Sequence, residues 1–453
     1  MIAPARRAAY DILSAISAGT ADLPTAIATA RDGLHDDRDR ALAADIAAGV
    51  QRWRAALDHL IVAFSKRPID RLDPEIVEIL RLGAYQLLHL DRVPAAAVVD
   101  DAVDLTRRAG KRSASGFVNA VLRTISRRRT SLPLPPRPID PTDRDAALEY
   151  LSVTLSHPRW LAARWYDRLG FEAAEAWMRF NNSAASVTLR ANRLRTTREQ
   201  LAQRLAAEDI QVHPTAFAPD GIVVDQGHPL RGRLNEEGLF VVQDEASQLV
   251  ALLAGDSRLH RVLDTCASPG GKTTALAAMM GGRGLLIACD LRERRLDLLR
   301  RTVAVSGAGN VRIVRADLLQ PLPFRPIFDA VLVDAPCSGL GTLRRDPDIR
   351  WRRREQDLPA LAGAELTMLR HAAGRVADRG RLIYATCSSE PEENEAVVAA
   401  FLATAPEFVP VPAGLATTRL AATLVDDRGH LRTQPHRHGL EAFFGAVFER
   451  RQP

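Results

Sequence analysis

The stretch Val331-Leu332-Val333-Asp334-Ala335-Pro336-Cys337-Ser338-Gly339 is an apolar run that ends abruptly in a carboxylate and a thiol. Short β-branched runs that are closed by Pro and Gly are typical of buried parallel strands rather than of helices. In an open parallel α/β sheet, ligands bind beyond the carboxyl ends of the strands. We therefore expect Asp334 and Cys337 to face a ligand site.

From about residue 237 to the end of the chain, further runs of this kind alternate with helical patterns. The predicted strands are 261–264, 284–290, 311–315, 330–334 and 381–385. This order predicts an α/β fold with a doubly wound, Rossmann-like parallel sheet over 237–453. A second thiol, Cys387, follows the last of these strands, so two cysteines are candidates for the attacking group.

Three segments of different character precede this sheet. Residues 1–129 repeat apolar positions at helical spacing, which predicts an all-helical bundle. Residues 130–143 hold five prolines, a density that favours a semi-rigid linker at a domain boundary. Residues 144–236 mix helical stretches with short strands, which indicates a small α+β domain.

The composition is that of a large globular protein with an excess of basic charge. The chain has 453 residues, 46% hydrophobic content and a net charge of +6. Such an excess favours an anionic partner such as a nucleic acid, although basic side chains are also common on solvated surfaces. Of the 61 basic residues only three are lysines, which makes Lys272 in a Gly-rich loop informative.

The cysteines indicate a reducing compartment. Four are present with no Cys-x-x-Cys pair and no histidine at ligand spacing: Cys266, Cys289, Cys337 and Cys387. A zinc site is therefore not expected. The amino terminus lacks the apolar stretch of a signal peptide, and no run reaches the ~18 apolar residues of a membrane span. We expect a cytoplasmic monomer with free thiols, no metal and no membrane contact.

The first predicted strand leads into the Gly-rich loop Cys266-Ala267-Ser268-Pro269-Gly270-Gly271-Lys272, after which a helix opens. Adjacent glycines and a helix N-terminus suit a nucleotide-like ligand. A phosphate-binding P-loop is the alternative, because Gly271-Lys272-Thr273 matches the end of that motif. Its first glycine should stand where this chain has Cys266, which disfavours that interpretation.

Two carboxylates follow the next strands at positions suited to a nucleoside. Asp290 ends the second strand, where an acid can bind the two hydroxyls of a ribose, although such residues also serve as helix caps. Asp317 follows the third strand and is placed to meet an adenine amino group.

These motifs together carry a family resemblance. The loop at 266–272, Asp334-Ala335-Pro336-Cys337-Ser338 and Thr386-Cys387-Ser388 resemble the S-adenosylmethionine-dependent RNA (cytosine-5)-methyltransferases. The first 129 residues look like a NusB-type RNA-binding domain, and the whole is similar to the RsmB (Sun/Fmu) branch, which acts on small-subunit (16S) ribosomal RNA. The resemblance implies S-adenosyl-L-methionine as cofactor and RNA as partner. It implies these cofactor-binding residues: Cys266, Ala267, Ser268, Pro269, Gly270, Gly271, Lys272, Asp290, Asp317 and Asp334.

Two cysteines make chemical sense in such a reaction. Carbon 5 of cytosine is a poor nucleophile, and a thiolate that adds to carbon 6 turns the ring into an enamine. The resemblance implies that Cys387 is the nucleophile, and Cys337 then assists release, with Asp334 and Lys272 as the other catalytic residues. The residues agree, because Ser389 and Glu392 have capping-box spacing, and a helix starting there would favour a Cys387 thiolate.

The residues leave more than one target RNA open. A basic stretch with an aromatic residue, 344–354, follows Cys337 and suits either RNA contact or a solvated surface. Transfer RNA is an alternative substrate for the same chemistry. A non-catalytic RNA-binding factor for ribosome assembly is a second alternative, disfavoured by the intact set of Asp334, Cys337 and Cys387.

Overall fold

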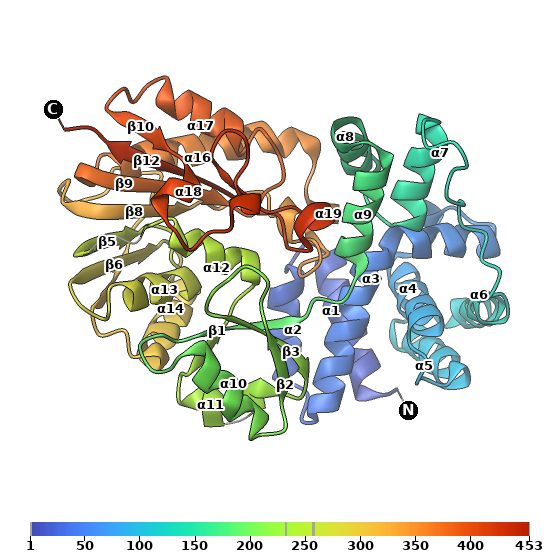
Figure 1. Ribbon diagram of the computed structural model, residues 1–453. Helices are drawn as coiled ribbons and strands as arrows, with labels where there is room; N and C mark the ends of the chain where they lie inside the picture. The colour runs from blue at the N-terminus through green and yellow to red at the C-terminus, as the bar shows by residue number, and fades with distance from the viewer. Residues whose placement is uncertain (1, 232, 256–258, 453) are drawn as a thin grey trace. The chain divides into compact units, whose positions relative to one another are not determined.

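The computed structural model describes residues 2–231, 233–255 and 259–452 (Figure 1). They form two compact units. The helical unit comprises Met1–Ser183 and Leu343–Glu355, and the sheet unit comprises Ala184–Thr342 and Gln356–Pro453. The domain limits predicted from the sequence did not assign residues 343–355 to the helical part of the chain. Those limits stay a prediction.

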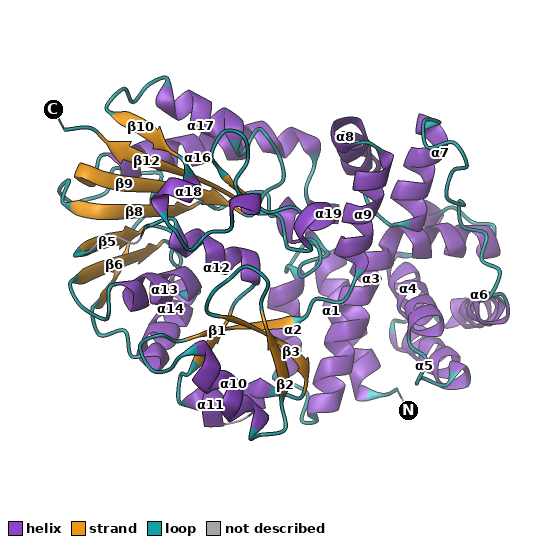
Figure 2. Cartoon of the chain, in the orientation of Figure 1, coloured by secondary structure: helices purple, strands orange, loops and turns teal. Residues whose placement is uncertain are grey.

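In the parts of the helical unit that the structure describes, all regular elements are helices (Figure 2). The α-helices are α1 (Pro4–Ser17), α2 (Leu23–Arg31), α3 (Asp37–Ser65), α4 (Pro74–His89), α5 (Ala95–Arg108), α6 (Ser115–Arg127), α7 (Arg144–Glu149), α8 (Arg159–Leu169), α9 (Phe171–Asn182) and α15 (Ile349–Arg352). The long α3 packs against α1 and α4. Gly49 of α3 leaves room for the ring of Tyr85, since a Cβ there would lie 1.9 Å from a ring carbon.

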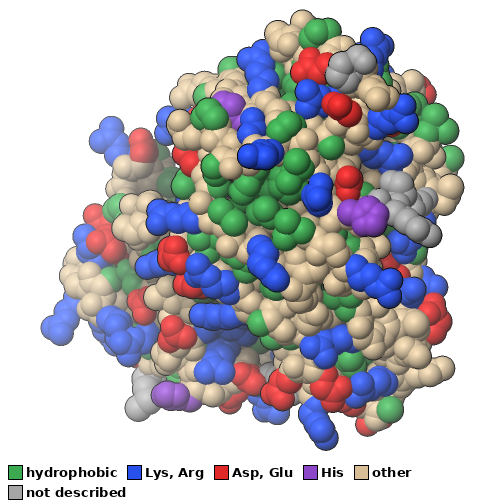
Figure 3. All heavy atoms as spheres, turned by 90° about the vertical axis from the view of Figure 1, so that its left-hand side faces the viewer, with side chains coloured by type: hydrophobic (Ala, Val, Ile, Leu, Met, Phe, Trp, Pro, Cys, Tyr) green, Lys and Arg blue, Asp and Glu red, His purple; other side chains and the backbone are tan. Residues whose placement is uncertain are grey.

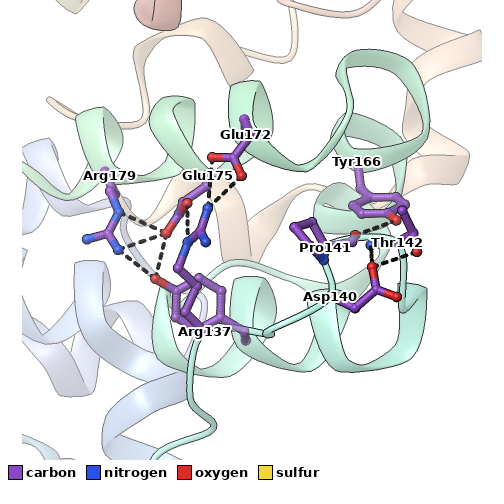
Figure 4. A network of polar contacts seen from close by, with 9 residues as sticks. Arg137, Asp140, Pro141, Thr142, Tyr166, Glu172, Glu175 and Arg179 are labelled. Carbon is purple, nitrogen blue, oxygen red and sulfur yellow. Dashed lines mark hydrogen bonds and ion pairs between the residues drawn. The ribbon is translucent and has the colours of Figure 1, made fainter.

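The proline-rich segment is irregular and is fixed to the helices that follow it (Figure 4). Arg137 donates to Glu172 at 2.6 Å and to Glu175 at 2.9 Å. Its guanidinium also lies over the ring of Phe171. The Tyr166 hydroxyl donates to the carbonyl of Pro141 at 2.9 Å. The prolines keep the segment extended, and these contacts hold it against α8 and α9.

The inserted segment 343–355 is anchored by buried polar side chains. Arg350 is fully buried and donates to the Ser156 carbonyl and to Asn182 Oδ1, both at 3.0 Å. Burial, reinforced by nearby Arg52, lowers the pKa of Arg350 to about 9. The Trp351 indole N–H donates to the carbonyl of Gln51 at 2.6 Å. This part of the basic stretch therefore serves folding of the helical unit.

A small antiparallel sheet opens the sheet unit. Its strand order is β2-β3-β1-β4. The strands are β1 (Val187–Ala191), β2 (Gln211–Pro214), β3 (Gly221–Gln226) and β4 (Phe240–Val242), accompanied by α10 (Arg198–Ala206) and α11 (Arg233–Glu236). A capping box between Thr197 and Gln200 starts α10. Its Leu201 and Leu205 are buried in the same hydrophobic cluster as Leu189 of β1.

The larger sheet has the order β10-β12-β9-β8-β5-β6-β7, with β11 paired to β12. Its strands are β5 (Arg261–Asp264), β6 (Leu285–Asp290), β7 (Val311–Arg315), β8 (Phe328–Asp334), β9 (Val376–Thr386), β10 (Phe408–Val411), β11 (Leu431–Arg432) and β12 (Phe444–Arg450). The strands from β5 to β9 pair in parallel, which confirms the predicted α/β class. At the C-terminal side β12 pairs antiparallel with β9, so the sheet is mixed rather than wholly parallel.

Helices cover both faces of this sheet (Figure 1). They are α12 (Glu245–Leu252), α13 (Gly271–Met279), α14 (Glu293–Ser306), α16 (Leu358–Ala373) and α17 (Glu395–Leu402). The short helices α18 (Ala413–Ala416) and α19 (Pro435–His438) lie in the chain between β10 and β12. Neighbouring residues of β8 serve opposite faces: Leu332 packs in the cluster of α12, α13 and α14, whereas Val331 and Val333 pack with α16 and α17. Burying such side chains stabilises the fold by about 1.5–3 kcal/mol each.

The charged side chains on one face of the molecule are mixed in sign. In Figure 3, Lys and Arg side chains are scattered among acidic ones around a group of hydrophobic side chains. On this face the positive net charge is therefore spread out and does not form a single basic stripe. Within the described ranges, no helix combines the length and apolar character needed to cross a bilayer.

We predict that Arg350→Ala destabilises the protein by about 2 kcal/mol, because buried carbonyl and amide acceptors lose their donor. Exposed Arg354 is the matched control, and Arg354→Ala should change stability by less than about 0.5 kcal/mol. Thermal unfolding measures both. An unchanged unfolding midpoint for Arg350→Ala, together with weaker RNA binding, would restore the interpretation of Arg350 as an RNA contact.

Candidate active site

The two candidate thiols meet beyond the ends of the neighbouring strands β8 and β9. Asp334, the last residue of β8, pairs in register with Ala385 of β9. The chain reaches Cys337 three residues after the first and Cys387 two residues after the second. Their Sγ atoms lie 3.3 Å apart, within hydrogen-bond distance for sulfur, and both side chains are half-buried. The parallel register thus brings together two cysteines that are 50 residues apart.

A backbone contact also joins the two thiol-bearing loops. The Gly341 N–H donates to the carbonyl of Cys387, and the Gly341 carbonyl accepts from the Ala442 N–H, both at 2.9 Å. A Cβ on Gly341 would stand 2.0 Å from the Ala442 carbonyl oxygen. Only glycine therefore permits this approach.

Lys272 brings a positive charge to the same place. It lies in the first turn of α13, donates to Asp334 Oδ2 at 2.7 Å, and sits over the ring of Phe443. Burial works to lower the pKa of Lys272, but the charge and hydrogen bond of Asp334, with a smaller effect of Cys387, raise it overall. The ammonium thus stays charged beside the carboxylate and the Cys387 thiol.

The Gly-rich loop connects β5 to α13. Gly270 has φ 107°, in the left-handed region, and precedes the first residue of the helix. Asp264, the last residue of β5, is fully buried and accepts from the Thr273 hydroxyl at 2.7 Å. Its other oxygen, Oδ1, is buried and has no hydrogen-bond partner within the described chain. Burial, with a smaller effect of Asp334, raises the pKa of Asp264 to about 7.

Two further carboxylates line the ends of the next strands. Asp290 ends β6 and is nearly buried; its oxygens accept from the N–H groups of Leu291 at 2.9 Å and Ser268 at 3.3 Å. The Ser268 carbonyl accepts from Arg295 at 2.8 Å. Asp317 follows β7 and is half-buried. The loop, Asp290 and Asp317 therefore all lie beyond the carboxyl ends of β5, β6 and β7.

The two thiols differ in environment from the other cysteines. A hydrogen bond with Cys387 and burial, with a smaller effect of Glu393, raise the pKa of Cys337 well above its ordinary value. Burial raises the pKa of Cys289 to about 12 and that of Cys266 further still. Cys289 packs in the core as a small apolar side chain, and Cys266 packs against it from the loop.

Comparison with known proteins places this chain in a family. Family models match residues 251–449 (16S rRNA methyltransferase RsmB/F), 3–127 (NusB family) and 157–231 (RsmF/B-like ferredoxin-like domain). The probable ribosomal RNA small subunit methyltransferase B of Bacillus subtilis is 32% identical over 414 residues, 90% of each chain. The chain belongs to the ribosomal RNA small subunit methyltransferase B family. The enzyme of that name from Pseudomonas putida is 34% identical over 88% of this chain and 89% of its own.

Solved structures agree with the fold. The crystal structure of PH0851 covers 99% of both chains with a TM-score of 0.80 at 26% identity. A methyltransferase homologue from Pyrococcus horikoshii covers 67% of this chain and 99% of its own, with a TM-score of 0.58 at 25% identity. NSun6 from the same organism, solved with SFG, shares the fold at 19% identity and a TM-score of 0.57.

The cofactor of the small subunit methyltransferase B family is S-adenosyl-L-methionine, and the residues here fit it. The glycine pair lets the loop pack closely, since a Cβ on Gly270 would lie 3.1 Å from Leu299 and Thr302, and one on Gly271 would lie 3.1 Å from Gln243. Asp264 has a buried oxygen without a partner among the described residues, and Asp290 and Asp317 supply acceptors for hydroxyl and amino groups. No cluster of three His, Cys, Asp or Glu residues in the described part of the chain has the geometry to hold a metal ion.

Two sequence expectations around the thiols are wrong. Helix α17 begins at Glu395, not directly after Cys387, and the Ser389 hydroxyl donates to Glu390 instead of forming a capping box with Glu392. A helix N-terminus therefore does not activate Cys387. Within the basic stretch, Arg350 is buried in the helical unit and is not presented to RNA, whereas Trp351 is half-buried and donates to the carbonyl of Gln51.

Sequence reasoning missed the buried groups beneath the thiols. Glu393 is fully buried and accepts from the backbone N–H of Ser338 at 2.6 Å. Glu365 of α16 is also buried, and its Oε2 lies within hydrogen-bond distance of the Tyr384 hydroxyl oxygen, at 3.0 Å. Burial, reinforced by the charge of Glu393, raises the pKa of Glu365 to about 9. An acid-rich run after Cys387 was the available signal, but it is typical of a solvated turn.

We predict that Asp264→Asn changes how stability depends on pH. Folded Asp264 holds its proton up to about pH 7, whereas the unfolded carboxyl releases it near its ordinary value of 3.8. Wild-type stability should therefore fall as pH rises from about 4 to 7, by about 1.4 kcal/mol for each unit of pKa shift expressed. The isosteric amide removes this loss. Unfolding midpoints of the cofactor-free proteins measure it, and parallel pH curves would contradict the raised pKa.

Proposed function

We propose that this chain transfers a methyl group from S-adenosyl-L-methionine to carbon 5 of a cytidine in small-subunit (16S) ribosomal RNA, through a covalent bond between Cys387 and the base. The observation that carries the proposal is the pair of thiols, 3.3 Å apart, beside the ion pair of Lys272 and Asp334. Family membership supports methyl transfer and the RNA substrate. The cytosine-5 chemistry is inferred from the site.

The charges around the thiols support Cys387 as the nucleophile. The Lys272 ammonium interacts with Cys387, and a nearby cation favours a thiolate. The carboxylate of Glu393 acts on the other thiol, where it adds to the raised pKa of Cys337. Cys337 is therefore protonated at neutral pH. A thiolate at Cys387 adds to carbon 6 of cytosine, and the electron pair of the ring then becomes available at carbon 5.

Asp334 is placed to hold the base during this addition. Its carboxylate ends β8 beside the thiols, is partly exposed, and takes a hydrogen bond from Lys272 on Oδ2. Ionised Asp334 accepts from the exocyclic amine of cytosine, and protonated Asp334 donates to N3. The bound cofactor supplies the methyl group on a sulfonium ion.

Release of the product requires loss of the carbon 5 proton and of the sulfur at carbon 6. The hydrogen-bonded thiols provide a balanced route for both. Cys337 takes the carbon 5 proton as it gives its own proton to Cys387, the carbon 5–carbon 6 double bond re-forms, and the bond from carbon 6 to Cys387 breaks. Both thiols end protonated, and Cys387 loses its proton before the next cycle.

The cofactor is held by the loop 266–272 together with Asp290, Asp317 and Asp334 in this proposal. The loop presents its backbone to the cofactor from the N-terminal end of α13. Asp290 accepts from the ribose hydroxyls, and Asp317 accepts from the adenine amino group. The acceptor capacity of a carboxylate, about four lone-pair sites, allows Asp290 to bind ribose while it holds the loop.

We predict that Asp290→Asn weakens binding of S-adenosyl-L-methionine by about 10- to 100-fold, because hydrogen bonds to a charged acceptor contribute about 1.5–3 kcal/mol. The shape of the side chain and its contacts with the loop are largely kept. Asp297→Asn, an exposed carboxylate on α14, is the matched control and should bind normally. Calorimetric titration measures both. Equal affinities for the two variants would remove Asp290 from the cofactor site.

We predict that Cys387→Ala abolishes methyl transfer, whereas Cys337→Ala still attacks the base but fails to release it. Small-subunit RNA incubated with each variant and the labelled cofactor should give a denaturant-resistant protein–RNA adduct with Cys337→Ala alone. An adduct with Cys387→Ala instead would reverse the two roles. Bisulfite sequencing of ribosomal and transfer RNA from a deletion strain identifies the target, and full methylation of both would favour a non-catalytic role.

A further inference from the structure

One buried carboxylate, that of Glu393, joins the two loops that carry the thiols. Its Oε1 accepts from the backbone N–H of Ser338, and its Oε2 accepts from the Ser338 hydroxyl, both at 2.6 Å. The Ser388 hydroxyl also donates to Oε2. Ser338 directly follows Cys337, and Ser388 directly follows Cys387. A single side chain therefore fixes the residue next to each thiol.

The carboxylate is well suited to hold this geometry. Glu393, Ser338 and Ser388 are all within 2% of complete burial, so water does not compete for their hydrogen bonds. The two hydroxyl oxygens lie 3.2 Å apart, which closes the network. A buried carboxylate is costly unless donors surround it, and here three donors from two loops do so. Separation of the loops would leave this charge without part of its compensation.

The titratable side chains of Glu365 and Tyr384, which pack beside Glu393, are neutral at pH 7. Glu365 on α16 has a pKa of about 9 and Tyr384 on β9 has a pKa raised well above its ordinary value. The Tyr384 hydroxyl donates to the Glu393 carbonyl at 2.5 Å. Lys272 of α13, paired with Asp334, also interacts with Cys387.

We propose that Glu393 is a positioning residue: by binding Ser338 and Ser388 at once it holds the sulfur atoms of Cys337 and Cys387 within proton-transfer distance. Its role in methyl transfer rests on the proposed function above, because only the two-thiol reaction needs that distance. The geometric part does not, and it can be tested without turnover.

The geometric test uses oxidation of the thiol pair by diamide. The two thiols lose two hydrogens and form a disulfide, and diamide takes up both hydrogens to become a hydrazine. Peptide mass spectrometry identifies the Cys337–Cys387 link and its rate. Glu393→Ala should slow cross-linking at least 10-fold. Glu393→Gln, which can accept from the Ser338 N–H and donate to the hydroxyls, should stay within about 3-fold of wild type. Glu392→Ala, at the half-buried neighbouring carboxylate, is the control and should cross-link normally.

The turnover test uses the same variants with small-subunit RNA. Glu393→Ala should lower kcat at least 100-fold, while KM for RNA and the affinity for S-adenosyl-L-methionine stay within about 3-fold. Glu393→Gln should recover most of kcat. It should also lower the pH at which Cys337 becomes reactive toward iodoacetamide, because the nearby negative charge is gone. If the role of Glu393 were purely structural, this pH profile would not change. A lowered kcat would then be accompanied by weaker binding of RNA or cofactor.

The outcomes separate the two proposals. If wild type makes no 5-methylcytidine but Glu393→Ala still slows cross-linking, the proposed function fails and the positioning role stands. If Glu393→Ala cross-links and turns over like wild type, the positioning role is overturned. Should Glu393→Ala fail to fold, Ser338→Ala and Ser388→Ala carry the test, since each removes one donor. Slower cross-linking in both supports the role, and normal rates in both overturn it.

Discussion

The site depends on the parallel pairing of β8 with β9. The register sets Asp334 opposite Ala385, so that the two strands end side by side. A shift of one residue would turn every side chain of β9 to the opposite face of the sheet and bury the wrong set. The register is secured because Val331 and Val333 pack with Leu382 and Tyr384 on one face, while Leu332 packs with Ile383 on the other. Packing of the core thus fixes where the thiols meet.

The carboxyl groups of the site differ in how deeply they are buried and in how many hydrogen-bond donors surround them. Asp264 and Glu365 are buried with few donors, and desolvation raises the pKa of both, to about 7 and about 9. Glu393 is buried as deeply but is surrounded by donors from Ser338 and Ser388. Asp334 is more exposed and has Lys272 beside it. Carboxyl groups with few donors thus have a raised pKa, whereas Glu393 and Asp334 are each matched by donors or by a cation.

The strands of the larger sheet were predicted more accurately from the sequence than the structure around the two thiols. Strands β5 and β7 have the predicted limits, because short apolar runs that end in a polar residue are clear signals. Strand β12 was missed, since Phe444 to Arg450 contains glycine and lies beyond any αβ repeat. The start of α17 was misplaced because Ser389 and Glu392 match a local pattern, whereas Asn394 bonds instead to Thr386 and to the carbonyl of Ser388. The basic stretch 344–354 also gives no sign that Arg350 is buried, because the residues that bury it are far away in the chain.

The choice of lysine at position 272 illustrates how the site limits its own interactions. The chain otherwise uses arginine almost throughout, yet an arginine here would present a planar fork that binds both oxygens of a carboxylate. The Lys272 ammonium is compact, and within the described residues its contact with Asp334 is a hydrogen bond to Oδ2. The remaining carboxylate oxygen is then left to a ligand. A bidentate arginine would instead occupy both oxygens of Asp334. Lysine therefore supplies the positive charge and still leaves an acceptor oxygen that arginine would take.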